Sequence, residues 1–99
     1  MNSPLKLSTR RDDHGDPVLA AAGEIDMSNV AGFRDALTQT AATAAEFTVD
    51  LTAVGYLDSA GLTALLPYAG RIKIIATTVL APVLSVSGLD PVTTVIPAP

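Results

Sequence analysis

The chain has 99 residues, of which 48% are hydrophobic and 16% charged, and its net charge at pH 7 is −4. This length suits one domain over residues 1–99, with an ordered part from about 5 to 96 and a proline-rich tail at 97–99. The absence of cysteine excludes disulfide scaffolds, thiol catalysis and cysteine-ligated zinc. The acidic balance argues against a nucleic-acid-binding protein.

The hydropathy pattern argues against a membrane protein. The longest apolar runs, 18–22 and 79–84, are far shorter than the roughly 18 residues that a membrane-spanning helix needs. The sequence also lacks the charged and then apolar leader of a secreted protein. These features predict a cytoplasmic protein with no membrane partner.

Two strands are expected at the start of the chain. Leu5 and Leu7 alternate with polar residues and predict a short first strand. The polar stretch 10–17 predicts a turn. The almost continuous apolar run 18–25 is typical of a central strand.

A helix and a third strand should follow. From Met27 onward, apolar residues recur at steps of three and four, as on one face of a helix, and Asp26 or Ser28 is expected to be its N-cap. Residues 46–51 then alternate between apolar and polar, which is the period of a strand with one buried face.

The second helix is expected to be short. Leu62, Leu65 and Leu66 have the spacing of one helix face. Pro67 removes a backbone donor and disfavours helix at the residue before it, and Gly70 provides a natural stop.

The last third of the chain predicts a strand, a helix and a strand. Residues 71–78 form the strand, Pro82 and Gly88 bracket a helix over 80–87, and 92–96 form a last short strand. The resulting order, β-β-α-β-α-β-α-β, predicts an α/β fold in which crossovers join parallel strands and one antiparallel strand is added at the start.

A polar corner lies between the third strand and the short helix. Asp58 is a suitable N-cap, because its carboxylate can accept backbone N–H groups of the first turn. The Ser59 hydroxyl should then point outward near the free N–H groups of the helix start, which form a natural anion site. A phosphate on it would add roughly −1.5 to −2 charges beside Asp58. We therefore interpret Ser59 as a regulatory phosphorylation site.

The surroundings of Ser59 are expected to be acidic. No lysine or arginine occurs between Asp35 and Gly70. If the strand ends gather Asp26, Asp50 and Asp58, the corner would bind free phosphate or nucleotide poorly. It would still present its serine to a kinase with a basic docking surface.

Two other interpretations of these side chains stay open. Ser59 could be a purely structural serine at a helix start. As a nucleophile it would need a base, and the single histidine, His14, lies far away in the early acidic turn. That turn is expected to be solvated rather than metal-binding, because one histidine in an acidic loop lacks a preorganised ligand geometry. No catalytic residue, metal or cofactor is therefore expected.

Three short motifs, in order, resemble the STAS domain family, the anti-sigma factor antagonists of bacteria. Asp-Ser-Ala-Gly-Leu at 58–62 is similar to the family's phosphorylation motif. Gly-Glu-Ile-Asp at 23–26 is similar to the end of its second strand, and Ser-Gly-Leu at 87–89 to the end of its last main helix. The resemblance implies a single STAS-like domain with a mixed sheet of four to five strands and about three helices.

The resemblance also implies a function. The unphosphorylated domain would bind an anti-sigma factor, a serine kinase of histidine-kinase-like ATPase fold, and so free a sigma factor in a bacterial stress response. Phosphorylation of Ser59 by that partner would end binding, and a phosphatase would reset the protein. We expect Gly61 to allow close approach of the partner. The expected partner-binding residues are Asp26, Ser28, Asp58, Ser59, Ala60, Gly61 and Leu62.

The sequence departs from the family in two places. The segment from Gly61 to Arg71 is shorter than in relatives by about two helical turns. The later helix is unusually apolar at Val83, Leu84 and Val86, so these residues are either all buried or partly an exposed patch that favours association. The alternative is therefore an unphosphorylated STAS scaffold or a domain that senses a small ligand or nucleotide, and a homodimer stays open.

Overall fold

The computed structural model describes residues 4–86 and 92–97 of the chain. Its elements follow the predicted order. The strands are β1 (Lys6–Arg11), β2 (Pro17–Ile25), β3 (Phe47–Leu57), β4 (Ile72–Thr77) and β5 (Val92–Ile96). The helices are α1 (Val30–Ala41), α2 (Ser59–Leu65) and α3 (Ala81–Val86), with a 3-10 turn, η1 (Leu66–Tyr68), directly after α2. The motif at 87–89 lies outside the described residues.

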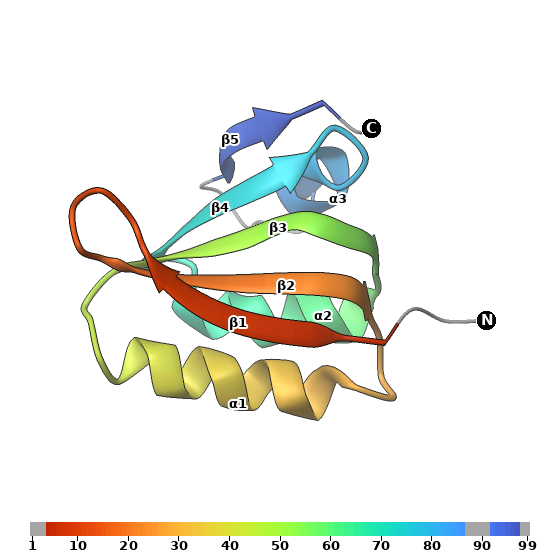
Figure 1. The fold of residues 1–99 in the computed structure, drawn as a ribbon. Helices are drawn as coiled ribbons and strands as arrows, with labels where there is room; N and C mark the ends of the chain where they lie inside the picture. The colour runs from red at the N-terminus through yellow and green to blue at the C-terminus, as the bar shows by residue number, and fades with distance from the viewer. Residues whose placement is uncertain (1–3, 87–91, 98–99) are drawn as a thin grey trace.

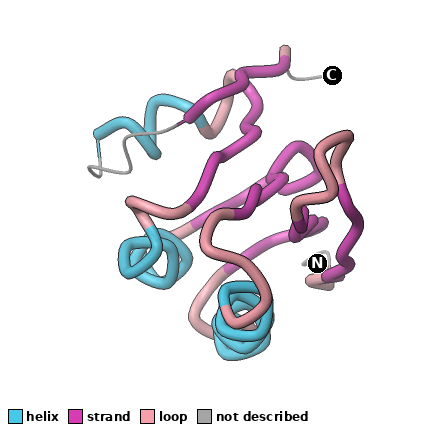
Figure 2. The backbone as a smooth tube through the Cα atoms, turned by 90° about the vertical axis from the view of Figure 1, so that its left-hand side faces the viewer, coloured by secondary structure: helices cyan, strands magenta, loops and turns pink. Residues whose placement is uncertain are grey.

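The five strands form one mixed sheet in the order β1-β2-β3-β4-β5 (Figure 1). β1 pairs antiparallel with β2, and β2 to β5 pair in parallel with one another. The three helices lie on one side of the sheet, and the other side is uncovered (Figure 2). Because consecutive parallel strands need crossovers, each helix returns the chain to the starting edge of the next strand. The α/β fold expected from the sequence is confirmed.

The core lies between the sheet and the helices. In the first half of β3 the side chains alternate as predicted, with Phe47, Val49 and Leu51 buried and the residues between them partly exposed. Phe33 and Leu37 of α1 are fully buried against this side of the sheet. The largest other fully buried side chains are Leu19, Ile25, Leu65, Ile74 and Leu84.

The third strand is longer than predicted, since it continues from residue 51 to Leu57. The alternation of apolar and polar residues breaks down after Thr52, and the sequence pattern therefore underestimates the strand. β2 keeps the second half extended through backbone pairing, with Ala22 opposite Ala53 and Ile25 opposite Leu57. Strand pairing depends on a neighbour distant in sequence, which a local pattern does not contain.

The predicted N-cap of α1 is wrong. The helix begins at Val30, and its N-cap, Asn29, makes no side-chain cap hydrogen bond. The Asn29 side chain instead accepts from the N–H of Asp26 at 3.0 Å and donates to the carbonyl of Glu24 at 2.8 Å. The Asp26 carboxylate accepts from the N–H of Ser28 at 2.9 Å. Residues 26–29 thus form a turn before the helix, and neither Asp26 nor Ser28 caps it.

The early polar turn and the short second helix are confirmed. The carboxylate of Asp12 accepts the N–H groups of His14 and Asp16 at 2.8 and 3.0 Å and closes the β1–β2 turn. Backbone hydrogen bonds from Asp16 and His14 lower the pKa of the Asp12 carboxyl. The charge of His14 acts in the same direction, and burial acts in the opposite one. α2 ends after seven residues, and Pro67 lies at the start of the 3-10 turn that follows.

Within residues 4–86 and 92–97, every helix is too short or too polar to cross a bilayer.

Candidate functional site

The corner at Ser59 is built by the end of β3 and the start of α2. Asp58 has an extended backbone and is the N-cap of α2, as predicted. Its Oδ1 atom accepts the N–H groups of Ala60 at 2.9 Å and Gly61 at 3.2 Å. A capping bond of this kind stabilises a helix by about 1 kcal/mol. Ser59, the first residue of the helix, is exposed.

The N–H groups of the first turn that follow Ser59 are not free to bind an anion. The two N–H groups that could have received a phosphate already donate to the Asp58 carboxylate. The N–H of Leu62 is also taken, since it donates to the Asp58 carbonyl at 3.1 Å. A phosphate on Ser59 would therefore project beside a carboxylate rather than settle on the helix N-terminus. The expectation that these N–H groups are free is wrong, while the exposure of the serine is confirmed.

Asp26 lies next to this corner. The N–H of Asp58 donates to the carbonyl of Ile25 at 3.2 Å, so the turn at 26–29 lies beside the first turn of α2. The Ser28 hydroxyl donates to the Asp26 carboxylate at 2.5 Å. This bond and the Ser28 N–H lower the pKa of the Asp26 carboxyl, because both stabilise its charged form. The structure thus brings the sequence motifs at 23–26 and 58–62 together.

Gly23 has a structural role in the first of these motifs. Its φ angle is +104°, in a region that L side chains rarely adopt. The pairing of β2 with β3 also shifts register between Gly23 and Glu24. This irregularity precedes buried Ile25 and partly exposed Asp26 at the end of the strand. The glycine therefore permits the strand ending that positions Asp26 beside Asp58.

Gly61 was expected to allow a partner to approach closely, and the structure contradicts this expectation. It is buried on the core side of α2. A Cβ atom at this position would overlap Cδ1 of Leu57 and lie 3.0 Å from Cγ2 of Ile25. The glycine allows α2 to pack closely on the ends of β2 and β3. Packing against Leu57 and Ile25 in the protein interior therefore explains why this residue has no side chain.

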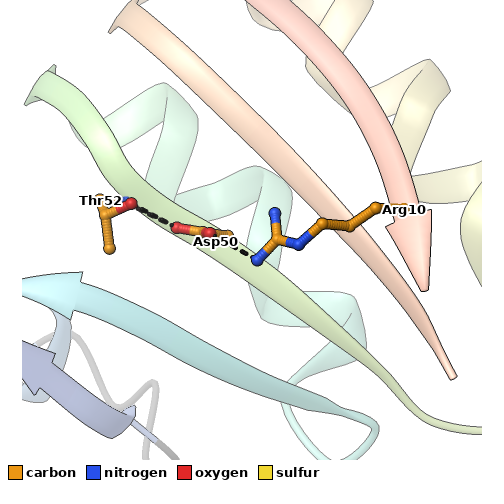
Figure 3. Close-up of polar contacts among 3 residues, drawn as sticks. All are labelled: Arg10, Asp50 and Thr52. Carbon is orange, nitrogen blue, oxygen red and sulfur yellow. Dashed lines mark hydrogen bonds and ion pairs between the residues drawn. The ribbon is translucent and has the colours of Figure 1, made fainter. Parts of the chain in front are cut away.

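Asp50 does not belong to the acidic corner. It lies inside β3 rather than at a strand end, because β3 continues to Leu57. Its carboxylate accepts from Arg10 at 2.9 Å and from the N–H and hydroxyl of Thr52 at 3.0 and 2.7 Å (Figure 3). Burial opposes ionisation of Asp50, but the bonds from Thr52 and Arg10 outweigh it and lower the pKa of the carboxyl. Arg10 therefore compensates the charge of Asp50 on the uncovered face of the sheet.

His14 is not placed to act on Ser59. It lies in the β1–β2 turn, before the start of β2, whereas Ser59 follows the end of the parallel neighbour β3 (Figure 1). His14 and Ser59 are therefore separated by about the length of β2. This strand has nine residues and is about 30 Å long at 3.3 Å per residue. In residues 4–86 and 92–97, acidic and histidine side chains form no group of three or more with metal-binding geometry.

Two exposed apolar residues flank the corner and were missed in the sequence. Met27, directly after Asp26, is 80% exposed, and Tyr56, two residues before Asp58, is 51% exposed. Met27 has the three-residue spacing of the helix face that follows it, and Tyr56 lies beyond the predicted strand, so no pattern in the sequence indicated that either side chain is exposed. With half-buried Leu62, they add apolar surface to the acidic groups.

A cleft of about 670 Å³ lies between β1 and α1, away from Ser59. Leu7 and Leu19 contribute apolar surface from the sheet, and Ala36 and Thr40 line it from α1. The Thr40 hydroxyl is already bonded to the Ala36 carbonyl at 2.8 Å. In the described parts of the chain, no buried side-chain nitrogen or oxygen lacks a hydrogen-bond partner. The cleft therefore offers a small ligand no unsatisfied buried polar group.

Comparison with known proteins places this geometry in a family. Residues 8–94 match the family model described as Mlab, STAS domain. An anti-sigma factor antagonist from Mycobacterium paratuberculosis has a similar structure, with a TM-score of 0.79 and 24% identity over 95% of this chain and 86% of that one. SpoIIAA, an anti-sigma factor antagonist in its unphosphorylated form, has a TM-score of 0.63 and 14% identity over 95% and 90% of the two chains. A comparison with curated proteins gives no match.

A third similar structure is the STAS domain of an anti-sigma factor antagonist from Rhodobacter sphaeroides. Its TM-score is 0.52 at 12% identity, and the match covers 71% of this chain and 82% of that one. At these identities the similar structures support the fold, while the family model covers most of the sequence. The membership expected from the short motifs is thus confirmed, and the chain belongs to the STAS domain family.

Proposed function

We propose that this protein is an anti-sigma factor antagonist controlled by phosphorylation of Ser59. In its unphosphorylated form it binds an anti-sigma factor in the bacterial cytoplasm and so frees a sigma factor. The anti-sigma factor is itself the serine kinase, and it supplies ATP and magnesium. The protein is its substrate and not an enzyme, and a phosphatase restores the unphosphorylated form.

The observation that carries this proposal is the exposure of Ser59 beside an already occupied helix cap. Because Asp58 accepts the N–H groups of Ala60 and Gly61, these two donors are already taken when a phosphate is added to Ser59. It would instead add roughly −1.5 to −2 charges next to Asp58 and close to Asp26. The fold can tolerate that charge in water, whereas a docked interface cannot.

The energetic effect is large enough for a switch. Burying an uncompensated charge in an interface costs several kcal/mol, roughly 3–5 where a buried pair is broken. Every 1.4 kcal/mol changes a dissociation constant about tenfold. A phosphate on Ser59 would therefore weaken binding by orders of magnitude, provided that the partner covers the corner.

The partner surface proposed here consists of groups around the corner. Asp26, Ser28 and Asp58 supply polar contacts for a basic partner surface, and Ala60 and Leu62 supply small or half-buried apolar contacts. Gly61 contributes indirectly, by allowing α2 to pack against the core. The names of the similar structures support an anti-sigma factor as the partner, since all three are called anti-sigma factor antagonists and one of them, SpoIIAA, is specified as unphosphorylated.

The acceptor residue can be tested by intact mass. The purified protein is incubated with candidate anti-sigma factors of its organism, ATP and magnesium. The wild type and Ser8→Ala, which removes another exposed serine, should each gain one phosphate, and Ser59→Ala should gain none. Phosphate on Ser59→Ala, or none on the wild type with any of these partners, would contradict the proposal.

A second function is favoured by a specific observation. The matching family model is named for Mlab rather than for an anti-sigma factor antagonist. α2 is also only seven residues long before the 3-10 turn. The alternative is a STAS interaction domain that docks in a larger assembly without phosphorylation. In that case Ser59→Ala and Ser59→Glu would bind their partner like the wild type.

A further inference from the structure

The segment that forms α3 is apolar on two sides. Leu80, just before the helix, and Leu84 are buried. Val79, Val83 and Val86 are 61%, 42% and 89% exposed. Val83 and Val86 are three residues apart in α3 and therefore lie on one face of the helix, and Val79 lies in the turn that leads into it. An apolar stripe therefore faces solvent, although a helix that is apolar all round is normally covered on both sides.

This stripe continues to the end of β5. The N–H of Thr78 donates to the carbonyl of Ile96 at 3.1 Å, so Val79 lies near Ile96, which is 40% exposed. β5 is the last strand in the sheet order, and its outer edge has no neighbouring strand in the described parts of the chain. We call Val79, Val83, Val86, Ile96 and the outer edge of β5 the β5 surface.

The two edges of the sheet differ in charge. The edge strand β1 carries Lys6, Arg10 and Arg11, all of them exposed. Charged side chains on an edge strand prevent it from pairing with the edge of another molecule. The sequence of β5 has no charged residue, and from Ile74 to residue 99 the chain contains a single one, Asp90. Charged side chains thus protect the β1 edge of the sheet from pairing, whereas the β5 edge has no such protection.

We propose that the β5 surface binds a second copy of this chain. The two β5 strands would lie side by side and antiparallel about a two-fold axis, with the α3 stripes in contact. In such an interface each residue near the axis meets its own copy, so a charge there would face a like charge. The uncharged β5 surface avoids this repulsion. A different partner would normally be selected by complementary charges, which this surface does not supply.

This interface is separate from the Ser59 corner. Ser59 follows β3, which is the middle strand of the sheet and lies two positions from β5. The inference therefore stands or falls independently of phosphorylation, and Ser59→Ala should dimerise like the wild type.

Sedimentation equilibrium tests the proposal on the full chain. From about 1 to about 300 µM, a range suited to a small interface, the wild type should shift toward twice the 10.1 kDa mass of one chain. Val86→Glu should raise the dissociation constant at least about tenfold, because two like charges would meet near the axis. Met27→Glu is the matched control, with 80% exposure against 89% for Val86, and should change the constant by less than about twofold.

Hydrogen exchange and circular dichroism complete the test. Both variants should keep the wild-type spectrum, since both side chains are exposed in the monomer. Peptides covering 92–97 should exchange more slowly at high protein concentration than at low concentration. A wild type that is monomeric at about 300 µM would overturn the proposal and assign the surface to another protein. Equal weakening by the two variants, or a dimer without protection at 92–97, would overturn it as well.

Discussion

The backbone N–H of Asp58 donates to the carbonyl oxygen of Ile25 across 3.2 Å. This bond extends the pairing of β2 and β3 beyond its last paired residues, Ile25 and Leu57. It holds the turn that contains Asp26 against the first turn of α2. Two motifs that are more than 30 residues apart in sequence thereby share one surface, with Ser59 exposed on it.

Close packing under α2 predicts opposite effects for two helical glycines. In Gly61→Ala the new methyl group would overlap Leu57, and Ile25 at 3.0 Å limits relief by movement. We expect a loss of about 1–2 kcal/mol in the free energy of unfolding, because overpacking exceeds the gain in helix propensity. Gly32→Ala in α1 has no atom within 4 Å of the new Cβ and should gain up to about 1 kcal/mol.

Urea unfolding of the two glycine variants measures this difference. Both substitutions add the same methyl group to a helix, so propensity alone would stabilise both. If Gly61→Ala were stabilised as much as Gly32→Ala, the close contact of α2 with Leu57 and Ile25 would be wrong.

The Arg10–Asp50 pair predicts a pH-dependent contribution to stability. The pKa of the Asp50 carboxyl is lowered in the folded protein, so its contribution is present above the ordinary value of 3.8 and is lost as the pH falls through the folded value. Asp50→Asn should therefore lower the free energy of unfolding by about 1–2 kcal/mol at pH 7, a moderate figure because the Arg10 side chain is 51% exposed.

Denaturant titrations at several pH values test this expectation. The difference between wild type and Asp50→Asn should shrink below about pH 4. Asp35→Asn removes an exposed carboxylate from α1 and is the control, with an expected change within about 0.5 kcal/mol. A difference for Asp50→Asn that stays constant down to pH 2.5, roughly one unit below the ordinary value, would contradict the role of its charge.

Local interactions made most elements and the corner predictable. Asp58 and Ser59 were located correctly because a helix cap joins residues only two or three positions apart. The strands and helices followed from the period of their apolar residues, and Pro67 marked the end of α2. These signals are contained in short windows of sequence.

Long-range interactions account for what the sequence did not predict. The guanidinium of Arg71 donates to the carbonyls of Ala41, Ala44 and Ala45 at 2.7–2.9 Å, which fixes the end of α1 against the start of β4. Asp50 was misplaced because the length of β3 depends on its pairing with β2. Bonds between residues 25 or more positions apart leave no pattern in a local window.

The most direct test of the phosphorylation switch is the affinity of the anti-sigma factor for four forms of the protein. Isothermal titration would compare the wild type, Ser59→Ala, Ser59→Glu and protein phosphorylated at Ser59. Ser8→Glu, which places the same charge at an exposed serine of β1, is the control.

We expect Ser59→Ala and Ser8→Glu to bind within about twofold of the wild type. Ser59→Glu and the phosphorylated protein should bind at least about 100-fold more weakly, which corresponds to about 2.7 kcal/mol. If the phosphorylated protein bound the anti-sigma factor as tightly as the wild type, Ser59 would not be the switch, and the protein would act as an unphosphorylated STAS interaction domain.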